Sequence, residues 1–394
     1  MKVNGFSFSA VKAGVRYPDR LDLGLIYCDH PCVTAGVLTT SQVQAAPVVI
    51  DEKRLKSGQT QAILVNSGCA NACTGKEGME IALATSRLMS NVLNISDDLV
   101  LLSSTGVIGE QLNLRAFETN CDALADGLAP DKFEQVAKAI MTTDTVMKTT
   151  RVTLTIDGRD VNIVGMAKGA GMIMPNMATM LSFVLTDADI HVDALQELLT
   201  EGVERTFNRI TVDGDTSTND MVLVMASGAA KNLTIEKSNS SGFQAFKKGL
   251  AVVLKDLALQ IVRDGEGATK TITVKVSGAK NDKDAEKIAR TIANSSLVKT
   301  AFFGEDANWG RILAAMGRSG VPFSPELVDV YFDDVCIAKN GLAVGTSAEE
   351  AATVVLKGKE FTLSVDLKDG TCSQEMYTCD FSLDYVRINA DYRS

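Results

Sequence analysis

Histidine is scarce in this sequence, whose 394 residues include only His30 and His191. The nucleophile elbow G-x-S-x-G is absent as well, so a Ser-His-Asp hydrolase finds neither its serine motif nor a well-placed base. His30 precedes Pro31 in a predicted turn and His191 opens a predicted helix, positions that favour surface and capping roles. An enzyme built on this sequence therefore has to take its catalytic base from another group.

Long apolar runs and basic clusters are missing too. No uncharged stretch of 18 residues could span a bilayer, and the first residues lack the apolar run of a signal peptide, so we expect a cytosolic protein. The chain carries 39 lysines and arginines against 49 aspartates and glutamates, a formal net charge of −10. This balance argues against nucleic acid or an anionic membrane as partner, because Lys/Arg clusters bind both. A small polar substrate fits better.

Motifs for nucleotides and zinc are not convincing. The sequence contains neither a P-loop nor a G-x-G-x-x-G between a strand and a helix. The C-x3-C pairs Cys28/Cys32 and Cys69/Cys73 could supply four zinc ligands, but Cys28 ends an apolar strand-like run, so we predict no metal and no organic cofactor. Without a secretory signal, the eight cysteines are expected as reduced thiols.

The stretch "DGDTSTND", Asp213–Asp220, begins like a calcium loop. However, Thr218 stands where that loop requires glycine, and Val224 stands where it requires a bidentate glutamate. We therefore predict a turn rich in hydroxyls and carboxylates, held by hydrogen bonds or scaffolding a site.

Strand-like and helical patterns alternate along the chain, which predicts an α/β protein with mixed sheets and enough length for two or three domains. Strands are expected at 2–11, 23–28, 61–66, 99–103, 152–156, 161–166, 180–185, 221–225, 272–276, 298–303, 328–337, 352–355, 361–366 and 381–387. Helices are expected at 77–93, 114–125, 132–141, 192–206, 241–262, 282–293 and 309–316, with Gly265 as the C-terminal cap of the helix over 241–262.

One stretch, "KGAGMIMPNMATMLSFVLTD" (168–187), suggests a nucleophile that carries its own base. A threonine at a chain's N-terminus can use its α-amine, whose reference pKa of about 7.7–8.0 lets it accept a proton near neutral pH. Thr179 reaches that position only if the Ala178–Thr179 bond is cut. Ala178 leaves its carbonyl uncrowded, Pro175 favours an extended Met174, and the glycines permit close approach. By spacing alone, a threonine before an apolar strand is usually just a strand-forming residue.

The same stretch resembles the self-processing site of the ornithine acetyltransferase (ArgJ, glutamate N-acetyltransferase) family, in which the threonine of "ATML" becomes the nucleophile of a new chain. Other segments resemble family signatures in family order across nearly the whole sequence. They are "GVLTTSQVQAAPV" (36–48), "NSGCANACTG" (66–75), "SSTGVIGE" (103–110), "MTTDT" (141–145), "FNRITVDGDTSTND" (207–220), "GEDANWGRILAAMGRSG" (304–320) and "DYVRINADYRS" (384–394).

The resemblance implies a ping-pong transfer of acetyl from N-acetylornithine to glutamate through acetyl-Thr179. It implies an oxyanion hole formed by the Thr105 hydroxyl and the Gly106 N–H, each such donor typically being worth ~3 kcal/mol of barrier. By the same resemblance, six residues bind substrate: Thr145, Lys168, Thr179, Glu266, Asn389 and Ser394. Charge complementarity further suggests that Lys168 meets a carboxylate and Glu266 an amine, while 213–220 helps to shape the side-chain pocket.

The implied fold is the DmpA/ArgJ-like fold, made as one precursor and cut into an α chain, 1–178, and a β chain, 179–394, with a C-terminal lobe from about 270. The family also implies an α2β2 heterotetramer. Two other interpretations stay open at this point: an N-terminal-nucleophile aminopeptidase of related fold, which would release the acyl group to water, and a non-catalytic protein that never cuts itself. The sequence does not report whether acetyl-CoA also serves as acetyl donor.

Overall fold

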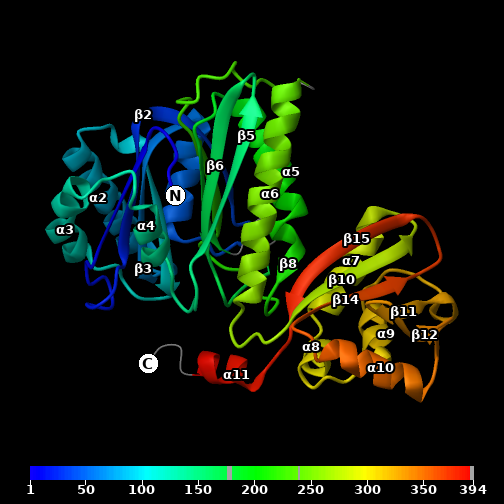
Figure 1. Ribbon diagram of the computed structural model, residues 1–394. Coiled ribbons are helices and arrows are strands. Elements are labelled where there is room, and N and C mark those ends of the chain that lie inside the picture. The colour runs from blue at the N-terminus through cyan, green and yellow to red at the C-terminus, as the bar shows by residue number, and fades with distance from the viewer. Residues whose placement is uncertain (175–179, 238–239, 391–394) are drawn as a thin grey trace. The chain divides into compact units, whose positions relative to one another are not determined.

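The computed structural model describes residues 1–174, 180–237 and 240–390, which form two compact units (Figure 1). The first unit comprises Met1–Gly169, Met174–Asn208 and Asp215–Ile261. The second comprises Ala170–Ile173, Arg209–Gly214 and the chain from Val262 onward. Each unit thus collects segments that lie far apart in the sequence.

A mixed sheet forms the centre of the first unit, with strand order β4-β3-β2-β9-β7-β6-β5 and β1 paired to β2. The strands are β1 (Phe6–Val11), β2 (Leu23–Leu38), β3 (Gln59–Cys69), β4 (Val100–Val107), β5 (Lys148–Ile156), β6 (Arg159–Lys168), β7 (Leu181–Thr186) and β9 (Met221–Ala226). β9 and β7 come from the sequence after residue 179, yet they lie between β2 and β6, which come from before it. The parallel pairing of β7 with β9 completes the centre of the sheet.

Alternating side chains divide the core of this unit between the two faces of the sheet. Ile26, Ile63 and Leu101 pack with Phe133 of α4 (Phe133–Ala139), whereas the neighbouring residues Leu25, Leu64 and Leu102 pack on the opposite side. That opposite side is covered by α2 (Gly75–Leu93) and α3 (Leu114–Asp126), seen beside the blue strands in Figure 1. This period of two is what a strand buried on both faces requires.

Three further helices belong to the first unit: α1 (Ala46–Arg54), α5 (Val192–Arg205) and α6 (Ser241–Arg263), the last of which continues into the second unit. α6 packs closely on β6, because a Cβ at Gly165 would lie 2.8 Å from Leu257 and 3.0 Å from Val253. Its apolar stripe confirms the helix predicted at 241–262. Gly265, which was predicted as the C-terminal cap of this helix, does not have the left-handed backbone conformation typical of a cap. Gly267, two residues later, has that conformation (φ 68°).

The second unit contains another mixed sheet, with strand order β13-β12-β11-β14-β10-β15-β8. Its strands are β8 (Ile210–Thr211), β10 (Thr271–Ala279), β11 (Asp329–Phe332), β12 (Val335–Lys339), β13 (Leu342–Ala343), β14 (Glu360–Asp366) and β15 (Cys372–Cys379). Its helices are α7 (Asp282–Ala293), α8 (Ser296–Phe303), α9 (Trp309–Gly317), α10 (Thr346–Leu356) and α11 (Leu383–Ala390). Short 3-10 turns in the described part of the chain are Leu55–Ser57, Asp97–Leu99, Phe207–Arg209 and Pro325–Leu327.

Three strands predicted in the second unit are helices instead. The segments expected as strands at 298–303 and 352–355 fall in α8 and α10, and the segment expected at 381–387 falls in α11 from Leu383 onward. In α8 the reason is tertiary packing, because Phe302 makes edge-to-face contacts with Phe332 and Phe361 at ring distances of 6.3 and 5.5 Å. Short apolar runs fit either structure, so periodicity alone could not decide between them.

The turn predicted around His30 and Pro31 is also wrong, because β2 continues through it to Leu38. The pairing of β2 with β3 shifts register between Tyr27 and Cys32, so a bulge accommodates the proline within the strand. β15 and α1 were not predicted. Among the described residues, no helix is both long and apolar enough to cross a membrane.

Candidate active site

Thr105 and Gly106 lie near the end of β4, where this strand runs parallel to β3. The pairing becomes irregular at Gly68 and Cys69, directly opposite these two residues. Gly106 has φ 133°, and a Cβ there would lie only 2.2 Å from the carbonyl carbon of Gly68. Glycine is therefore required at 106, both for its backbone conformation and for the close approach of the two strands.

Lys168 is the last residue of β6, and its ammonium reaches Thr105. Lys168 Nζ donates to Thr105 Oγ1 at 3.2 Å, and both residues are 9% exposed. Because the hydroxyl oxygen accepts this bond, the hydroxyl proton of Thr105 can be donated to another acceptor. The structure thus brings together two of the residues that the sequence nominated.

A buried carboxylate, that of Asp144, lies beside this lysine. Asp144 Oδ1 accepts from Lys148 Nζ at 2.6 Å and from the Gly169 N–H at 2.7 Å, while Oδ2 accepts from the Thr142 N–H at 2.9 Å. The side chains of Asp144 and Lys148 are both fully buried. Asp144 thereby fixes the backbone immediately after Lys168.

The electrostatics of this cluster favour an anion. Burial by itself would raise the pKa of Asp144, but the charges of Lys168 and Lys148 and the Gly169 N–H outweigh it and lower the pKa to about 2. One carboxylate against two ammonium groups leaves one positive charge in excess among these three side chains. A substrate carboxylate or a developing oxyanion would be stabilised beside them.

The predicted polar turn at 213–220 does scaffold β4. Asn219 Nδ2 donates to the carbonyl of Ala70 at 2.6 Å and to that of Ser104 at 2.8 Å. Ser104 Oγ in turn donates to Asn66 Oδ1 at 2.7 Å. The peptide that joins Ser104 to Thr105 is therefore held in place by a buried amide.

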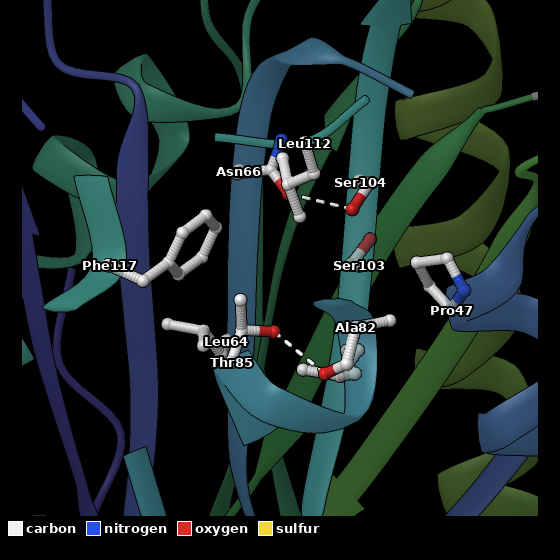
Figure 2. Close-up of a pocket in the computed structure, with 10 residues that line it drawn as sticks. Pro47, Leu64, Asn66, Ala82, Thr85, Ser103, Ser104, Leu112 and Phe117 are labelled. Carbon is white, nitrogen blue, oxygen red and sulfur yellow. Dashed lines mark hydrogen bonds between the residues drawn. The ribbon is translucent and has the colours of Figure 1, made fainter. Parts of the chain in front are cut away.

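Behind β4 lies a cavity of about 10 Å³, between the strand, α2 and α3. Figure 2 shows Ser103 and Ser104 at the right and Phe117 at the left, with Asn66 above and Thr85 below. Its volume is about that of one water molecule, far below what an amino acid needs. This cavity is therefore a packing defect or a water site, not the substrate pocket.

In the second unit, Glu266 and Asn389 are in contact. Asn389 Nδ2 donates to Glu266 Oε2 at 2.8 Å, and the Glu266 N–H donates to the Ala170 carbonyl at 2.8 Å. A Cβ at Gly171 would lie 2.3 Å from Glu266 Oε2. Any side chain at 171 would therefore displace this carboxylate, which explains one glycine of the "GAG" stretch.

Three of the nominated residues, Ala178, Thr179 and Ser394, lie outside the described part of the chain. Thr145 is exposed in the loop before β5, directly after Asp144. Asp144 was not nominated from the sequence, although it lies in the quoted "MTTDT" motif. The signal available in the sequence was that Asp144 lies between two polar residues and four residues ahead of Lys148.

Both histidines have the surface and capping roles that the sequence predicts for them. His191 caps α5, its Nδ1 accepting from the Asp193 N–H at 3.3 Å, and His30 contacts the Ser227 carbonyl through Nε2 at 3.0 Å. All eight cysteines are free thiols.

Comparison with known proteins identifies relatives of the whole chain. The ArgJ family matches residues 7–394. The "Arginine biosynthesis bifunctional protein ArgJ" of Desulfotalea psychrophila is 66% identical over 394 residues, covering 100% of both chains. The protein of the same name from Geobacter sulfurreducens is 50% identical over 394 residues, again covering 100% of both.

A solved structure is also similar. A chain of the arginine biosynthesis bifunctional protein ArgJ from Bacillus halodurans shares 49% identity, with a TM-score of 0.51. The match covers 53% of the present chain and 97% of the solved one. The solved chain therefore corresponds to about half of this sequence.

Proposed function

Because the chain belongs to the ArgJ family, a family of acyltransferases of arginine biosynthesis, we propose that it transfers the acetyl group of N2-acetyl-L-ornithine to L-glutamate. The products are L-ornithine and N-acetyl-L-glutamate. The observation that carries this proposal is the full-length match to bifunctional ArgJ proteins. The Lys168–Thr105 contact supports it, because acyl transfer needs donors for an oxyanion.

The proposed nucleophile, Thr179, is released when the precursor cuts itself. The Thr179 hydroxyl oxygen attacks the Ala178 carbonyl carbon, the C–N bond breaks, and the hydroxyl proton passes to the leaving nitrogen, which becomes the α-amine. Water then hydrolyses the ester, giving the Ala178 carboxylate and a free Thr179 hydroxyl. A solved relative whose chain matches about half of this sequence is what a cut precursor would give.

The same groups then catalyse a ping-pong transfer. The α-amine of Thr179 accepts the hydroxyl proton as the oxygen attacks the acetyl carbon of N-acetylornithine. The Thr105 hydroxyl and the Gly106 N–H stabilise the tetrahedral oxyanion, and ornithine leaves with the proton. Glutamate then attacks acetyl-Thr179 through its amino group, which completes the cycle.

Substrate recognition is assigned by charge. Lys168, one of the two lysines that give the cluster with Asp144 its excess positive charge, binds the substrate carboxylate, and Glu266 binds an ammonium group. Asn389 orients Glu266 through its 2.8 Å hydrogen bond. Thr145 and Ser394 are assigned to substrate binding by the family resemblance alone.

The sheet of the first unit would keep the two cut chains together. β9 and β7 of the proposed β chain lie between β2 and β6 of the proposed α chain, so each flanking pair of strands crosses from one chain to the other. We further propose that two such pairs form an α2β2 heterotetramer, whose mass size-exclusion chromatography with light scattering would measure.

No step of this mechanism uses a metal or an organic cofactor. Transferase activity should therefore survive dialysis against a chelator. The name "bifunctional" in the relatives suggests a second reaction, N-acetylglutamate synthesis from acetyl-CoA. An assay that supplies acetyl-CoA and glutamate without N-acetylornithine tests this second activity.

Denaturing electrophoresis and a product assay test the proposal. The wild-type protein should give two bands, and Thr179→Ala should give one full-length, inactive chain. Two bands from Thr179→Ala would show that another residue makes the cut. If N-acetylornithine and glutamate yield acetate but no N-acetylglutamate, the aminopeptidase-like alternative holds instead.

A further inference from the structure

The stretch 212–221, which contains the "DGDTSTND" motif, has hydrogen bonds to the chain just before the proposed cleavage site. In the second unit, Asp213 Oδ2 accepts from the Met172 N–H at 2.6 Å and Oδ1 accepts from the Ile173 N–H at 2.9 Å. The Val212 N–H donates back to the Ile173 carbonyl at 2.7 Å. One carboxylate thus holds two successive amides.

The backbone held in this way has an unfavourable conformation. Met172 has φ 55°, in the left-handed region that is unfavourable for a residue with a side chain. Its side chain is 41% exposed, so packing offers little to hold it, whereas Ile173 is buried. The two hydrogen bonds to Asp213 are charge-assisted, the strong kind, and offset this cost. Asp213 therefore determines the direction in which the chain leaves Ile173.

Further along the same stretch, residues of the first unit form hydrogen bonds to the chain on both sides of the proposed cleavage site. Thr216 Oγ1 donates to the Met174 carbonyl at 3.0 Å, on the upstream side. The Met221 N–H donates to the Met180 carbonyl at 2.9 Å, on the downstream side. The nearest described residues before and after 175–179 are therefore bonded to one continuous stretch.

We propose that Asp213, assisted by Thr216, is a positioning residue for cleavage of the Ala178–Thr179 bond. This inference rests on the self-cleavage proposed above. The attack of Thr179 Oγ on the preceding carbonyl is intramolecular, so its rate depends on how closely the flanking backbone is held to the reactive geometry. Anchors at Met172, Ile173, Met174 and Met180 restrict that backbone on both sides. Asp213 acts through the backbone amides of Met172 and Ile173.

The test follows the cleavage of newly made precursor, by cell-free translation and denaturing electrophoresis over time. Asp213→Asn preserves size but replaces one acceptor oxygen with an amide donor that faces a backbone N–H. We expect its cleavage to be roughly tenfold to hundredfold slower, the loss that small misplacements cause. Thr216→Val should slow cleavage less, and Thr216→Ser, which keeps the hydroxyl, should restore the wild-type rate.

Asp329→Asn is the matched control in the same unit. The buried Asp329 carboxylate also accepts a backbone N–H, that of Asn340 at 2.8 Å, but it is not bonded to the 172–174 segment. Rates are compared well below the melting temperature of every variant. Slow cleavage of Asp213→Asn beside normal cleavage of Asp329→Asn supports the proposal.

The contrary outcomes separate two failures. If wild type is cut while Asp213→Asn is cut equally fast, the positioning role is wrong and self-cleavage stands. Equal slowing of Asp213→Asn and Asp329→Asn would make the effect one of stability and would also refute the role. A wild-type precursor that never cuts overturns the self-cleavage, and the role of Asp213 with it.

Discussion

The Lys168 ammonium donates to the Thr105 hydroxyl oxygen at 3.2 Å, joining the end of β6 to β4 across the first unit. This bond occupies a lone pair of Thr105 and leaves its proton available to an incoming oxyanion. In the proposed mechanism, Lys168 therefore has two uses, one as a positive charge and one as the group that orients the Thr105 hydroxyl. The predictions below follow from this contact and from its surroundings.

Thr105→Val should lower kcat for acetyl transfer by about 10²–10³, the usual effect of removing one oxyanion donor. The KM for N-acetylornithine should change little, because the oxyanion exists only in the transition state. Thr105→Ser keeps the hydroxyl and should retain most of the activity. Steady-state kinetics on fully cut protein measure both, and a change confined to KM would contradict an oxyanion role.

Gly106→Ala should abolish activity and destabilise the fold, because its Cβ would overlap the Gly68 backbone. Gly109→Ala is the control, since Gly109 also has a positive φ, 86°, but no atom lies within 4 Å of an added Cβ. It should lose only about 1–2 kcal/mol of unfolding free energy, the backbone cost alone. Similar losses in the two variants, measured by denaturant unfolding, would show that the close approach is unimportant.

The Asp144 carboxylate should make stability depend on pH in acid. Its folded pKa of about 2 lies below the ordinary value of about 3.9, so its ionised form stabilises the fold above about pH 4, and that contribution is lost as pH falls towards 2. The loss is about 2 kcal/mol. The difference in unfolding free energy between wild type and Asp144→Asn should shrink over this range, and a constant difference would contradict the assignment.

Glu266→Gln should raise the KM for N-acetylornithine or glutamate about tenfold to a hundredfold, the effect of losing a hydrogen bond to a charged group. The Asn389 contact should survive, because the glutamine oxygen can still accept it. Glu360→Gln, at an exposed ion pair with Arg263, is the control and should leave KM unchanged. Equal KM values for Glu266→Gln and wild type would remove Glu266 from substrate binding.

The cut chains should remain associated in native buffer and separate only on unfolding. β9 pairs with β2, and β7 with β6, along their lengths, so separation would expose unpaired strands in the centre of the sheet. Size-exclusion chromatography followed by denaturing electrophoresis should find both bands in one peak. Chains that separate at neutral pH without denaturant would contradict the sheet order.

Much of the secondary structure could be predicted from local patterns. The amphipathic helices at 77–93, 114–125 and 282–293 were located almost to the residue, because an apolar stripe repeats clearly over three or more turns. Among the failures were short apolar segments such as 298–303. Their conformation depends on partners distant in the sequence, as Phe302 shows with Phe332 and Phe361.

For the candidate site, the family resemblance nominated the residues that would act on the substrate. It did not nominate the residues that hold them in place. Lys168 and Thr105 were nominated separately. Their contact appears only in the folded structure, because β6 and β4 are separated by four other strands in the order of the sheet. Asp144 and Asp213 act through backbone amides. The spacing of Asp144 from Lys148 was a local signal, but no pattern of residue types marks the amide that a carboxylate binds far away in the sequence.

The sequence by itself determined the family of acyltransferases, through motifs over nearly the whole chain, while two unsuitable histidines and a threonine after a small residue predict a nucleophile that carries its own base. The tertiary structure decided which charges act together and which backbone is held. Folding places Asp144 beside Lys148 and Lys168, whose charges outweigh the effect of burial and lower its pKa, and Asp213 stabilises the left-handed Met172. Both effects depend on distance and desolvation, which exist only after the chain has folded.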